Sequence, residues 1–362
     1  MPSLFDLALP LMRLLPPEAA HRASIRALSA GLAPSASMAD PADLSVRLWR
    51  RNLPNPVGLA AGFDKDVEVA DAMLAFGFGF VEVGTITPLP QKGNPKPRVF
   101  RLSEDRAVIN RLGFNSAGLE AAARRLALRR SKGGFVGANI GKNRDTQDDI
   151  GDYVEGVRVL APLADYLTVN ISSPNTPGLR NLQRKTAVTR LIAQLMEARG
   201  RATPRNPPPL LLKIAPDLTA DERSDLAEAA LSSGIDGLIV ANTTVARPAC
   251  LKSRFAHEPG GLSGEPLFAP STTLLSEMYR LTSGKVPLIG VGGIASGGDA
   301  YQKIRAGASL VQLYTALVFH GPGLVQRIKR ELSDLLARDG FTSISAAVGA
   351  DAHLPSTTPH GL

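Results

Sequence analysis

The sequence contains one cysteine, few aromatic residues and no long apolar run. The lone Cys250 excludes an intramolecular disulfide and the cysteine-rich kinds of structural zinc site, and it fits a reducing, cytosolic compartment. No apolar run reaches the roughly 18–20 residues that are needed to span a bilayer. The first residues lack a basic leader before their apolar stretch, so we predict neither a membrane-spanning helix nor a signal peptide.

Charge and composition narrow the class of partner. The net charge is +8, but aromatic residues make up only 5% of the chain, and no long Lys/Arg run is interleaved with them. Nucleic acid is therefore a poor candidate, whereas an anionic substrate or an anionic lipid surface fits a basic protein. With 44% hydrophobic residues over 362 positions, the chain can bury a large core.

Past residue 50, short runs rich in Val, Ile, Leu, Gly and Ala alternate with helical stretches. Nearly continuous apolar runs are typical of strands that are buried on both faces of a parallel sheet. The predicted strands cover residues 57–62, 80–86, 135–140, 166–172, 210–215, 237–243, 286–292 and 309–314. The clearest helical stretches cover residues 116–128, 186–199, 220–233 and 271–282. Eight such units in sequence favour an α/β fold of the (β/α)8 TIM barrel type, with an open doubly wound sheet as the alternative.

The predicted barrel occupies residues 46–340, and further regions flank or interrupt it. Residues 1–45 are expected to form an extension of two short amphipathic helices, the second over residues 18–32. Their apolar positions follow helical spacing: Leu4, Leu7, Leu11 and Leu14, then Ile25, Leu28 and Leu32. Such faces fit either packing on the barrel or a reversible anchor at a membrane surface. The proline-rich connection 87–115 is long enough to indicate a function or structure of its own, and residues 341–362 are expected to be disordered.

Two glycine-containing stretches suggest a phosphate site. The first, at residues 289–294, includes Gly292 and Gly293, and the second, at residues 306–309, leads into the eighth strand. Barrels often bind a phosphate with backbone N–H groups near their last two strands, although glycines also serve plain tight turns. The sequence has no Walker A motif and no dinucleotide fingerprint in a βαβ setting. A separate nicotinamide-binding domain is therefore not expected.

Polar side chains recur at the carboxyl ends of the predicted strands, where a barrel has its active site. Lys65 and Lys213 could bind an anion, although a structural ion pair is an equal alternative for either one alone. Six asparagines lie at or just beyond strand ends: Asn110, Asn115, Asn139, Asn170, Asn175 and Asn242. An amide both donates and accepts, which suits a planar, amide-containing heterocycle, although turn chemistry explains some of these positions.

Ser173 lies in a loop that contains proline and glycine and follows the fourth predicted strand. It does not belong to a nucleophile elbow, and no histidine is placed to form a triad with it. A free serine could act as a base only if proton removal is coupled to another bond change. The loop itself resembles a lid that could exclude solvent.

Taken together, these motifs resemble those of the dihydroorotate dehydrogenase family. The resemblance extends from about residue 17 to residue 330, and its strongest stretches are residues 58–65 and 110–116. Residues 170–178, 241–244 and 260–264 add to it. Several long motifs in one order are far more specific than any one of them alone.

The resemblance implies one FMN prosthetic group per chain and Ser173 as the catalytic base. The positions that match flavin contacts are Ala60, Ala61, Gly62, Phe63, Asp64, Lys65, Thr85, Asn139, Asn170, Lys213, Ala241, Gly264, Gly293, Tyr314 and Thr315. The positions that match orotate contacts are Lys65, Asn110, Arg111, Leu112, Gly113, Phe114, Asn170, Asn175, Asn242 and Thr243. No metal site is implied.

The resemblance also implies a class within the family. Soluble members carry a cysteine as the base, whereas this chain carries Ser173 and an N-terminal helical extension, as the quinone-using class does. The implied activity is the oxidation of (S)-dihydroorotate to orotate in de novo pyrimidine (UMP) biosynthesis, with a membrane quinone as electron acceptor. His21 and Arg101 match residues of the quinone tunnel. The implied location is the cytoplasmic face of the inner cell membrane, peripherally bound, with no obligatory protein partner.

Three other interpretations remain open from the sequence. A Schiff-base aldolase on the same barrel would use Lys213 as its nucleophile. A non-catalytic membrane scaffold would bind no flavin and would leave the polar strand ends unexplained. A soluble-class dehydrogenase is the nearest alternative, and lipid and acceptor dependence would separate it from the quinone-using class.

Overall fold

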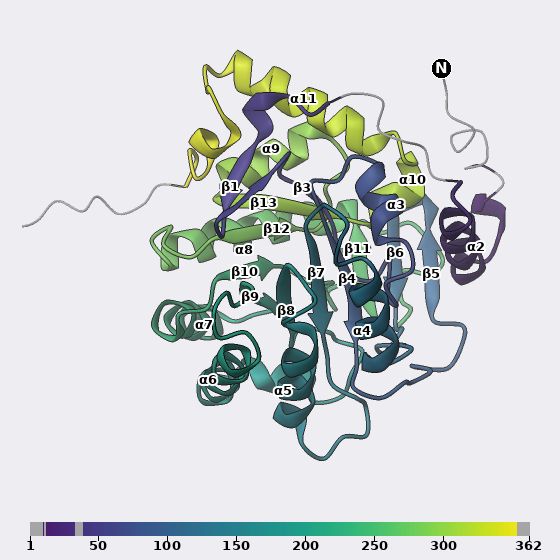
Figure 1. Cartoon of the computed structure of the whole chain (residues 1–362). Coiled ribbons are helices and arrows are strands. Elements are labelled where there is room, and N and C mark those ends of the chain that lie inside the picture. Colours follow the sequence, from purple (N-terminus) through teal and green to yellow (C-terminus); the bar gives the residue numbers. More distant parts are fainter. Residues whose placement is uncertain (1–9, 11, 33–38, 353–362) are drawn as a thin grey trace, which may run out of the picture.

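Eight parallel strands close into a barrel in a computed structural model that describes residues 10, 12–32 and 39–352 (Figure 1). Around the barrel the strand order is β10-β12-β13-β3-β4-β7-β8-β9. The strands are β3 (Val57–Leu59), β4 (Phe80–Ile86), β7 (Val136–Ile140), β8 (Tyr166–Asn170), β9 (Leu210–Ile214), β10 (Gly237–Val240), β12 (Leu288–Val291) and β13 (Ala308–Leu313). Each lies within or beside one of the eight predicted runs, so the TIM barrel is confirmed and the open sheet is wrong.

Several strands are shorter than predicted at their carboxyl ends. The first ends at Leu59 rather than residue 62, and the sixth ends at Val240 rather than residue 243. In both places the extra residues lie beyond the strand and border a cavity, although Ala60 and Ala241 still donate to the backbone of the neighbouring strands. The apolar run that marks the strand therefore continues into the loop that builds the site.

An outer layer of helices surrounds the barrel (Figure 1). The helices are α3 (Ala70–Ala75), α4 (Leu119–Leu128), α5 (Asp149–Leu160), α6 (Lys185–Ala202), α7 (Ala220–Ser233), α8 (Phe268–Leu281), α9 (Gly297–Arg305), α10 (Thr315–His320) and α11 (Leu324–Arg338). The four predicted helices correspond to α4, α6, α7 and α8. The bounds of α7 match the prediction because Thr219 and Glu222 form a capping box at its start and Gly234 ends it in the left-handed conformation.

A small antiparallel sheet, unforeseen in the sequence, borders the carboxyl end of the barrel. Its order is β11-β6-β5, formed by Gly261–Gly264, Ala107–Asn110 and Val99–Leu102. Two of its strands come from the long connection 87–115, which was expected to have structure of its own. The sheet has a separate apolar cluster of Phe100, Leu102, Ala107, Ile109 and Leu262.

The opposite, amino end of the barrel is covered by a hairpin of β1 (Val46–Leu48) and β2 (Arg51–Leu53). Trp49, in its turn, stacks on Phe135 and Tyr166, each with ring centroids 6.2 Å apart, and donates to the backbone of Asp236. These partners lie at or before the first residues of barrel strands. The hairpin therefore closes the barrel at this end. The cavity lies at the other, carboxyl end.

The second predicted helix of the N-terminal extension is α2 (Pro17–Ser29), which packs beside β5 (Figure 1). Its Glu18 pairs with Arg98, at 2.8 Å, and Leu28 is buried. Leu32 is 59% exposed and Leu14 is 82% exposed. Three of the four leucines of the first predicted helix, Leu4, Leu7 and Leu11, lie outside the described residues. Within the described residues, no helix has the length and apolar character to cross a membrane.

The expectation of a disordered tail from residue 341 is wrong for residues 341–352. These residues include a short 3-10 helix, Ile344–Ala347, whose first and last residues are both buried. Arg305 binds Asp351 through two nitrogens. The small residues that suggested disorder instead allow close packing on α9. Residues 353–362, the rest of the predicted tail, lie outside the described residues.

Candidate active site

One cavity of about 670 Å³ opens at the carboxyl end of the barrel, bordered by strand ends, the small sheet and α2. All but two of the predicted site residues line it. They are His21, Ala60, Ala61, Gly62, Phe63, Asp64, Lys65, Thr85, Arg101, Asn110, Leu112, Gly113, Phe114, Asn170, Ser173, Asn175, Lys213, Ala241, Asn242, Thr243, Gly264, Gly293, Tyr314 and Thr315. Its volume is in the range of small-molecule and cofactor sites.

The two exceptions are Asn139 and Arg111, which do not belong to the cavity lining. Asn139 is fully buried behind the wall, where its Oδ1 accepts hydrogen bonds from Thr85 and Asn170. The guanidinium of Arg111 pairs with Glu258, at 2.7 Å, away from the cavity. Both residues therefore support the wall rather than form it. The family resemblance placed both of them at the site but could not say which layer of the wall they occupy.

Lys65 and Lys213 reach the cavity from the first and fifth barrel strands without a counterion. In the described chain, neither ammonium group forms an ion pair or a hydrogen bond, so the structural ion pair is excluded there for both. Burial lowers the pKa of Lys65 to about 8. Burial also lowers the pKa of Lys213, against the opposing charge of Glu82. Two buried cations without partners favour an anionic ligand.

Five of the six candidate asparagines line the cavity, and they come from segments far apart in the chain: Asn110, Asn115, Asn170, Asn175 and Asn242. Asn175 donates to the backbone oxygen of Asn110, at 3.0 Å. Asn242 donates to Ser172 Oγ, at 3.0 Å, and that hydroxyl donates to Asn170 Oδ1 over the same distance. Linked amides of this kind can match the donors and acceptors of a planar heterocycle.

Ser173 lies beside these amides and is 7% exposed. Its Oγ accepts a hydrogen bond from the backbone N–H of Asn175, at 3.2 Å. It forms no hydrogen bond to a histidine or a carboxylate in the described chain, which agrees with the expectation that no triad is present. The hydroxyl therefore borders the cavity, and no histidine or carboxylate of the described chain is placed to accept its proton.

The glycine stretch at 289–294 borders the cavity, whereas the stretch at 306–309 does not. Residues 306–309 contain the start of β13, and the start of a barrel strand lies at the opposite end from the site. The residues after β13, Tyr314 and Thr315, take the expected place. Gly293 has φ +76°, and a Cβ there would lie 2.5 Å from Phe268, so this turn requires glycine.

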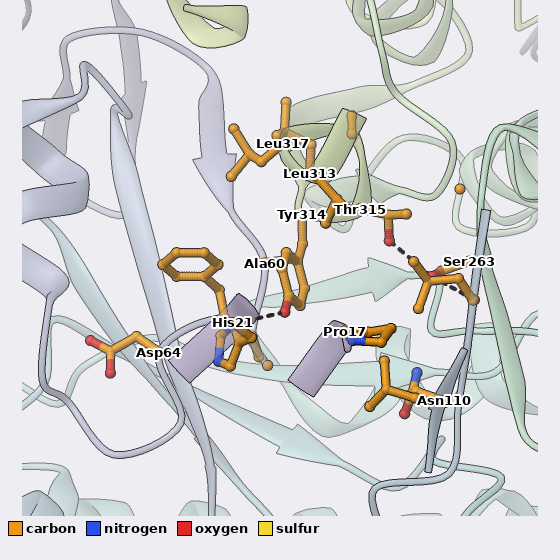
Figure 2. Close-up of a pocket in the computed structure, with 18 of the residues that line it drawn as sticks. Pro17, His21, Ala60, Asp64, Asn110, Ser263, Leu313, Tyr314, Thr315 and Leu317 are labelled. Atoms are coloured by element: carbon orange, nitrogen blue, oxygen red, sulfur yellow. Dashed lines mark hydrogen bonds between the residues drawn. The ribbon is translucent and has the colours of Figure 1, made fainter. Parts of the chain in front are cut away.

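Sequence reasoning missed two polar residues at this end of the cavity, Ser263 and Gln312. Thr315 donates to Ser263 Oγ, at 2.8 Å (Figure 2). The Oε1 atom of Gln312 is buried and has no partner among the described residues, although the side chain lines the cavity. An unsatisfied acceptor there fits a ligand that donates a hydrogen bond. In the sequence, the signal for Gln312 was a polar residue inside an apolar strand.

The far end of the cavity lies against α2. Figure 2 shows His21 beside Tyr314, whose hydroxyl is 3.3 Å from His21 Nδ1. Phe63 meets both rings edge-on, with centroids 5.4 Å away in each case. Burial and the nearby charge of Lys65 lower the pKa of His21 to about 4. His21 is therefore neutral at neutral pH.

Arg101 also borders the far end, as predicted for the tunnel. Its guanidinium donates to the backbone oxygen of Arg13, at 2.6 Å, and burial lowers its pKa. Arg13 in turn donates to the backbone of Val318 and Phe319 in α10. These contacts join the segment before α2 to both β5 and the end of the barrel. No group of His, Cys, Asp or Glu side chains in the described residues could bind a metal ion.

Comparison with known proteins agrees with this geometry. Residues 43–336 match the family described as dihydroorotate dehydrogenase. A dihydroorotate dehydrogenase (quinone) from Parvibaculum lavamentivorans is 58% identical, over 97% of this chain and 99% of that protein. The mitochondrial dihydroorotate dehydrogenase (quinone) of Mus musculus is 55% identical, over 94% of this chain and 88% of that protein.

Solved structures give the same result. The crystal structure of DHODH from Eimeria tenella in complex with ferulenol superposes with a TM-score of 0.90 at 44% identity. That match covers 92% of this chain and 95% of the other. The ligand-free form from the same organism has a TM-score of 0.89 at 46% identity, over 93% of this chain and 99% of that one. This chain therefore belongs to the dihydroorotate dehydrogenase family of oxidoreductases.

Proposed function

We propose that this protein oxidises (S)-dihydroorotate to orotate, with one FMN per chain and a membrane quinone as electron acceptor, in de novo pyrimidine (UMP) biosynthesis. The observation that carries the proposal is one cavity that joins Ser173, two unpaired lysines and five asparagines to α2. The names of the relatives, which specify quinone, support the choice of acceptor.

The cavity fits FMN in its chemistry. Gly264, Gly293 and Thr315 border one end, where backbone N–H groups could bind a phosphate. Lys213 and Gln312 offer a cation and a free acceptor to the polar edge of a ring. When bound, FMN supplies a two-electron acceptor that the side chains of the protein lack.

Around that cofactor the protein would bind the substrate and move one proton. Lys65 would bind the carboxylate of dihydroorotate, and the asparagines would bind its ring amides. Ser173 would remove the proton from C5 while two electrons and the C6 hydrogen leave the substrate. Burial of Ser173 and its loop would exclude water from this step.

The α2 end of the cavity is the proposed quinone entrance, lined by His21 and Arg101. The exposed side chains of Leu14, Leu15 and Leu32 lie on the same segment. Apolar side chains and the basic Arg22 and Arg26 of α2 suit peripheral binding to an anionic membrane. We place the protein on the cytoplasmic face of the inner membrane, with no obligatory protein partner.

The decisive experiment is anaerobic spectroscopy of the purified protein. We expect a yellow protein that bleaches with dihydroorotate and regains its colour with a short-chain quinone. Bleaching without recovery by quinone would move the protein to the soluble class. A colourless preparation that stays colourless with FMN would overturn the proposal. Trapping by borohydride with a keto substrate would then test Lys213 as a Schiff-base nucleophile.

A further inference from the structure

Glu82 lies in the closed interior of the barrel, on β4, and is 0% exposed. Four side chains donate to its carboxylate. Asn139 donates to Oε1 at 2.8 Å, and Oε2 accepts from Tyr166 at 3.1 Å, Thr168 at 3.1 Å and Gln312 at 2.9 Å. With four donors directed at it, the group acts purely as an acceptor. Glu82 does not line the cavity.

The carboxylate fixes the orientation of the Asn139 amide. Because Glu82 can only accept, the Nδ2 of Asn139 must face it and the Oδ1 must face the other way. That Oδ1 accepts from Thr85 Oγ1 at 2.7 Å and from Asn170 Nδ2 at 3.1 Å. The reverse orientation would set an oxygen against the carboxylate and leave two donors without an acceptor.

The same constraint passes from Asn139 to the cavity wall. The Nδ2 of Asn170 is committed to Asn139 and to Thr85 Oγ1, at 3.0 Å, so its Oδ1 faces Ser172 and Asn242. Asn242 donates one N–H to Ser172 Oγ, and its Oδ1 accepts from the backbone of Thr243 at 2.8 Å. The Nδ2 of Asn242 also donates to Asn170 Oδ1, at 3.4 Å, so the group that remains for a ligand is a lone pair on Asn242 Oδ1.

We propose that Glu82 is a positioning residue, which sets the orientation of the Asn170 amide and, through it, of the Asn242 amide that the substrate ring meets. It does so through Asn139, without touching the ligand. The inference rests on the proposed function, since it takes the ligand to be the amide-containing ring of dihydroorotate or orotate. A ring with complementary donors and acceptors binds, whereas the reversed pattern leaves buried polar groups unpaired.

The test compares two variants of nearly unchanged shape. In Glu82→Gln the side chain that faces Asn139 can donate a hydrogen bond as well as accept one, so the Asn139 amide can turn over. Thr168→Val removes one donor to the same carboxylate but leaves the carboxylate itself as the acceptor for Asn139. The readouts are FMN content, thermal unfolding, and the orotate Kd from the change that orotate causes in the visible spectrum of the holoprotein.

We expect the orotate Kd to rise about tenfold in Glu82→Gln, with FMN content and unfolding close to those of Thr168→Val. Thr168→Val should bind orotate within about twofold of the wild type. An orotate Kd in Glu82→Gln within the same twofold limit would overturn the positioning role. Parallel losses of FMN and orotate in both variants would also overturn it, since they would indicate a structural role alone.

A second variant keeps the inference testable if Glu82→Gln does not fold. Asn139→Leu removes the link between Glu82 and Asn170, and it should raise the orotate Kd by a similar factor. Adding Glu82→Gln to Asn139→Leu should change the Kd less than twofold further, because the path is already broken. An unchanged Kd in Asn139→Leu would reject the inference. Failure of the wild-type holoprotein to bind orotate would instead reject the proposed function.

Discussion

The hydroxyl of Tyr314 lies 3.3 Å from Nδ1 of His21, so the last barrel strand and the N-terminal extension meet at one polar contact. The rings of both residues pack on Phe63. This contact separates two kinds of chemistry in one cavity. On one side lie the amides and lysines of the substrate region, and on the other lies the end against α2, which His21 and Arg101 border.

That division predicts a selective defect for His21→Phe. The variant keeps a ring on Phe63 but loses the contact with Tyr314. Reduction by dihydroorotate should stay within about twofold of the wild type, whereas reoxidation by quinone should slow about tenfold. Stopped-flow measurement of each half-reaction checks this, with His257→Phe as control because His257 is exposed and lies outside the cavity. Equal slowing of both half-reactions would contradict the division.

The neutral state of His21 predicts that quinone reduction does not vary with pH through this residue near neutrality. Its pKa is lowered to about 4, mainly by burial, so the side chain is neutral above that pH. We expect no change in the rate of quinone reduction from His21 between pH 5.5 and 8. A group with the ordinary histidine pKa would titrate within that range. A step near pH 6.5 that disappears in His21→Phe would show that His21 is charged in the working protein.

Ser173→Ala should leave the cofactor bound but stop its reduction. Ser173 borders the cavity, and its Oγ accepts a hydrogen bond from the backbone N–H of Asn175. We expect the rate of flavin reduction by dihydroorotate to fall by a factor of about 10²–10⁴, with FMN content and orotate Kd nearly unchanged. Rapid reduction retained in this variant would remove Ser173 from the base position. Single-turnover absorbance measurements under anaerobic conditions give the answer.

Much of the fold could be predicted because its signals are local. Continuous apolar runs marked the eight strands, and the predicted bounds of α7 coincide with the capping box of Thr219 and Glu222 and with Gly234. The hairpin under the barrel and the sheet β11-β6-β5 were missed, because their strands are only three or four residues long. The pairing of β6 with β11 joins segments more than 150 residues apart, which no local pattern reports.

The sequence could predict which residues belong to the candidate site, but not which of them line the cavity and which lie behind its wall. Polar residues at strand ends identified Lys65, Lys213 and Ser173, since only a site justifies such residues there. The same argument placed Asn139 in the wall, although it lies behind it. Glu82 was missed because a single acidic residue within an apolar run carries no spacing signal. Its importance depends on four donors from three other strands.

Lys65 predicts how substrate affinity varies with pH. Burial lowers its pKa to about 8, so the ammonium is charged below that pH and neutral above it. Affinity for the orotate anion should therefore be constant from pH 6 to 7.5 and fall by up to about tenfold per unit above pH 8. Lys65→Gln should bind weakly with a flat profile, while Lys92→Gln, at an exposed lysine outside the cavity, should keep the wild-type profile. A wild-type profile that is flat to pH 9.5 would contradict this role.

Lys303 predicts an unusual dependence of stability on pH. Its ammonium is buried on α9 and donates to Ser271 Oγ at 2.8 Å and Thr272 Oγ1 at 2.9 Å, with no carboxylate partner among the described residues. Burial lowers its pKa to about 7, from the 10.5 of an exposed lysine. Between these values the unfolded chain binds more protons than the folded one. Stability from this group should therefore rise with pH, by at most about 1.4 kcal/mol per unit.

Lys303→Met removes that dependence. Ser271 and Thr272 keep their backbone acceptor, the carbonyl oxygen of Phe268, so the variant leaves no hydroxyl donor unpaired. We expect Lys303→Met to match or exceed the wild type in stability at pH 7 and to lose this advantage by pH 10. Urea unfolding at several pH values measures the difference.

Lys329→Met is the matched control, because Lys329 is equally buried but pairs with Asp40. Its loss should destabilise the protein at every pH where Asp40 is charged. A Lys303→Met variant that tracks the wild type in parallel from pH 7 to 10 would show that Lys303 stays charged in the folded protein.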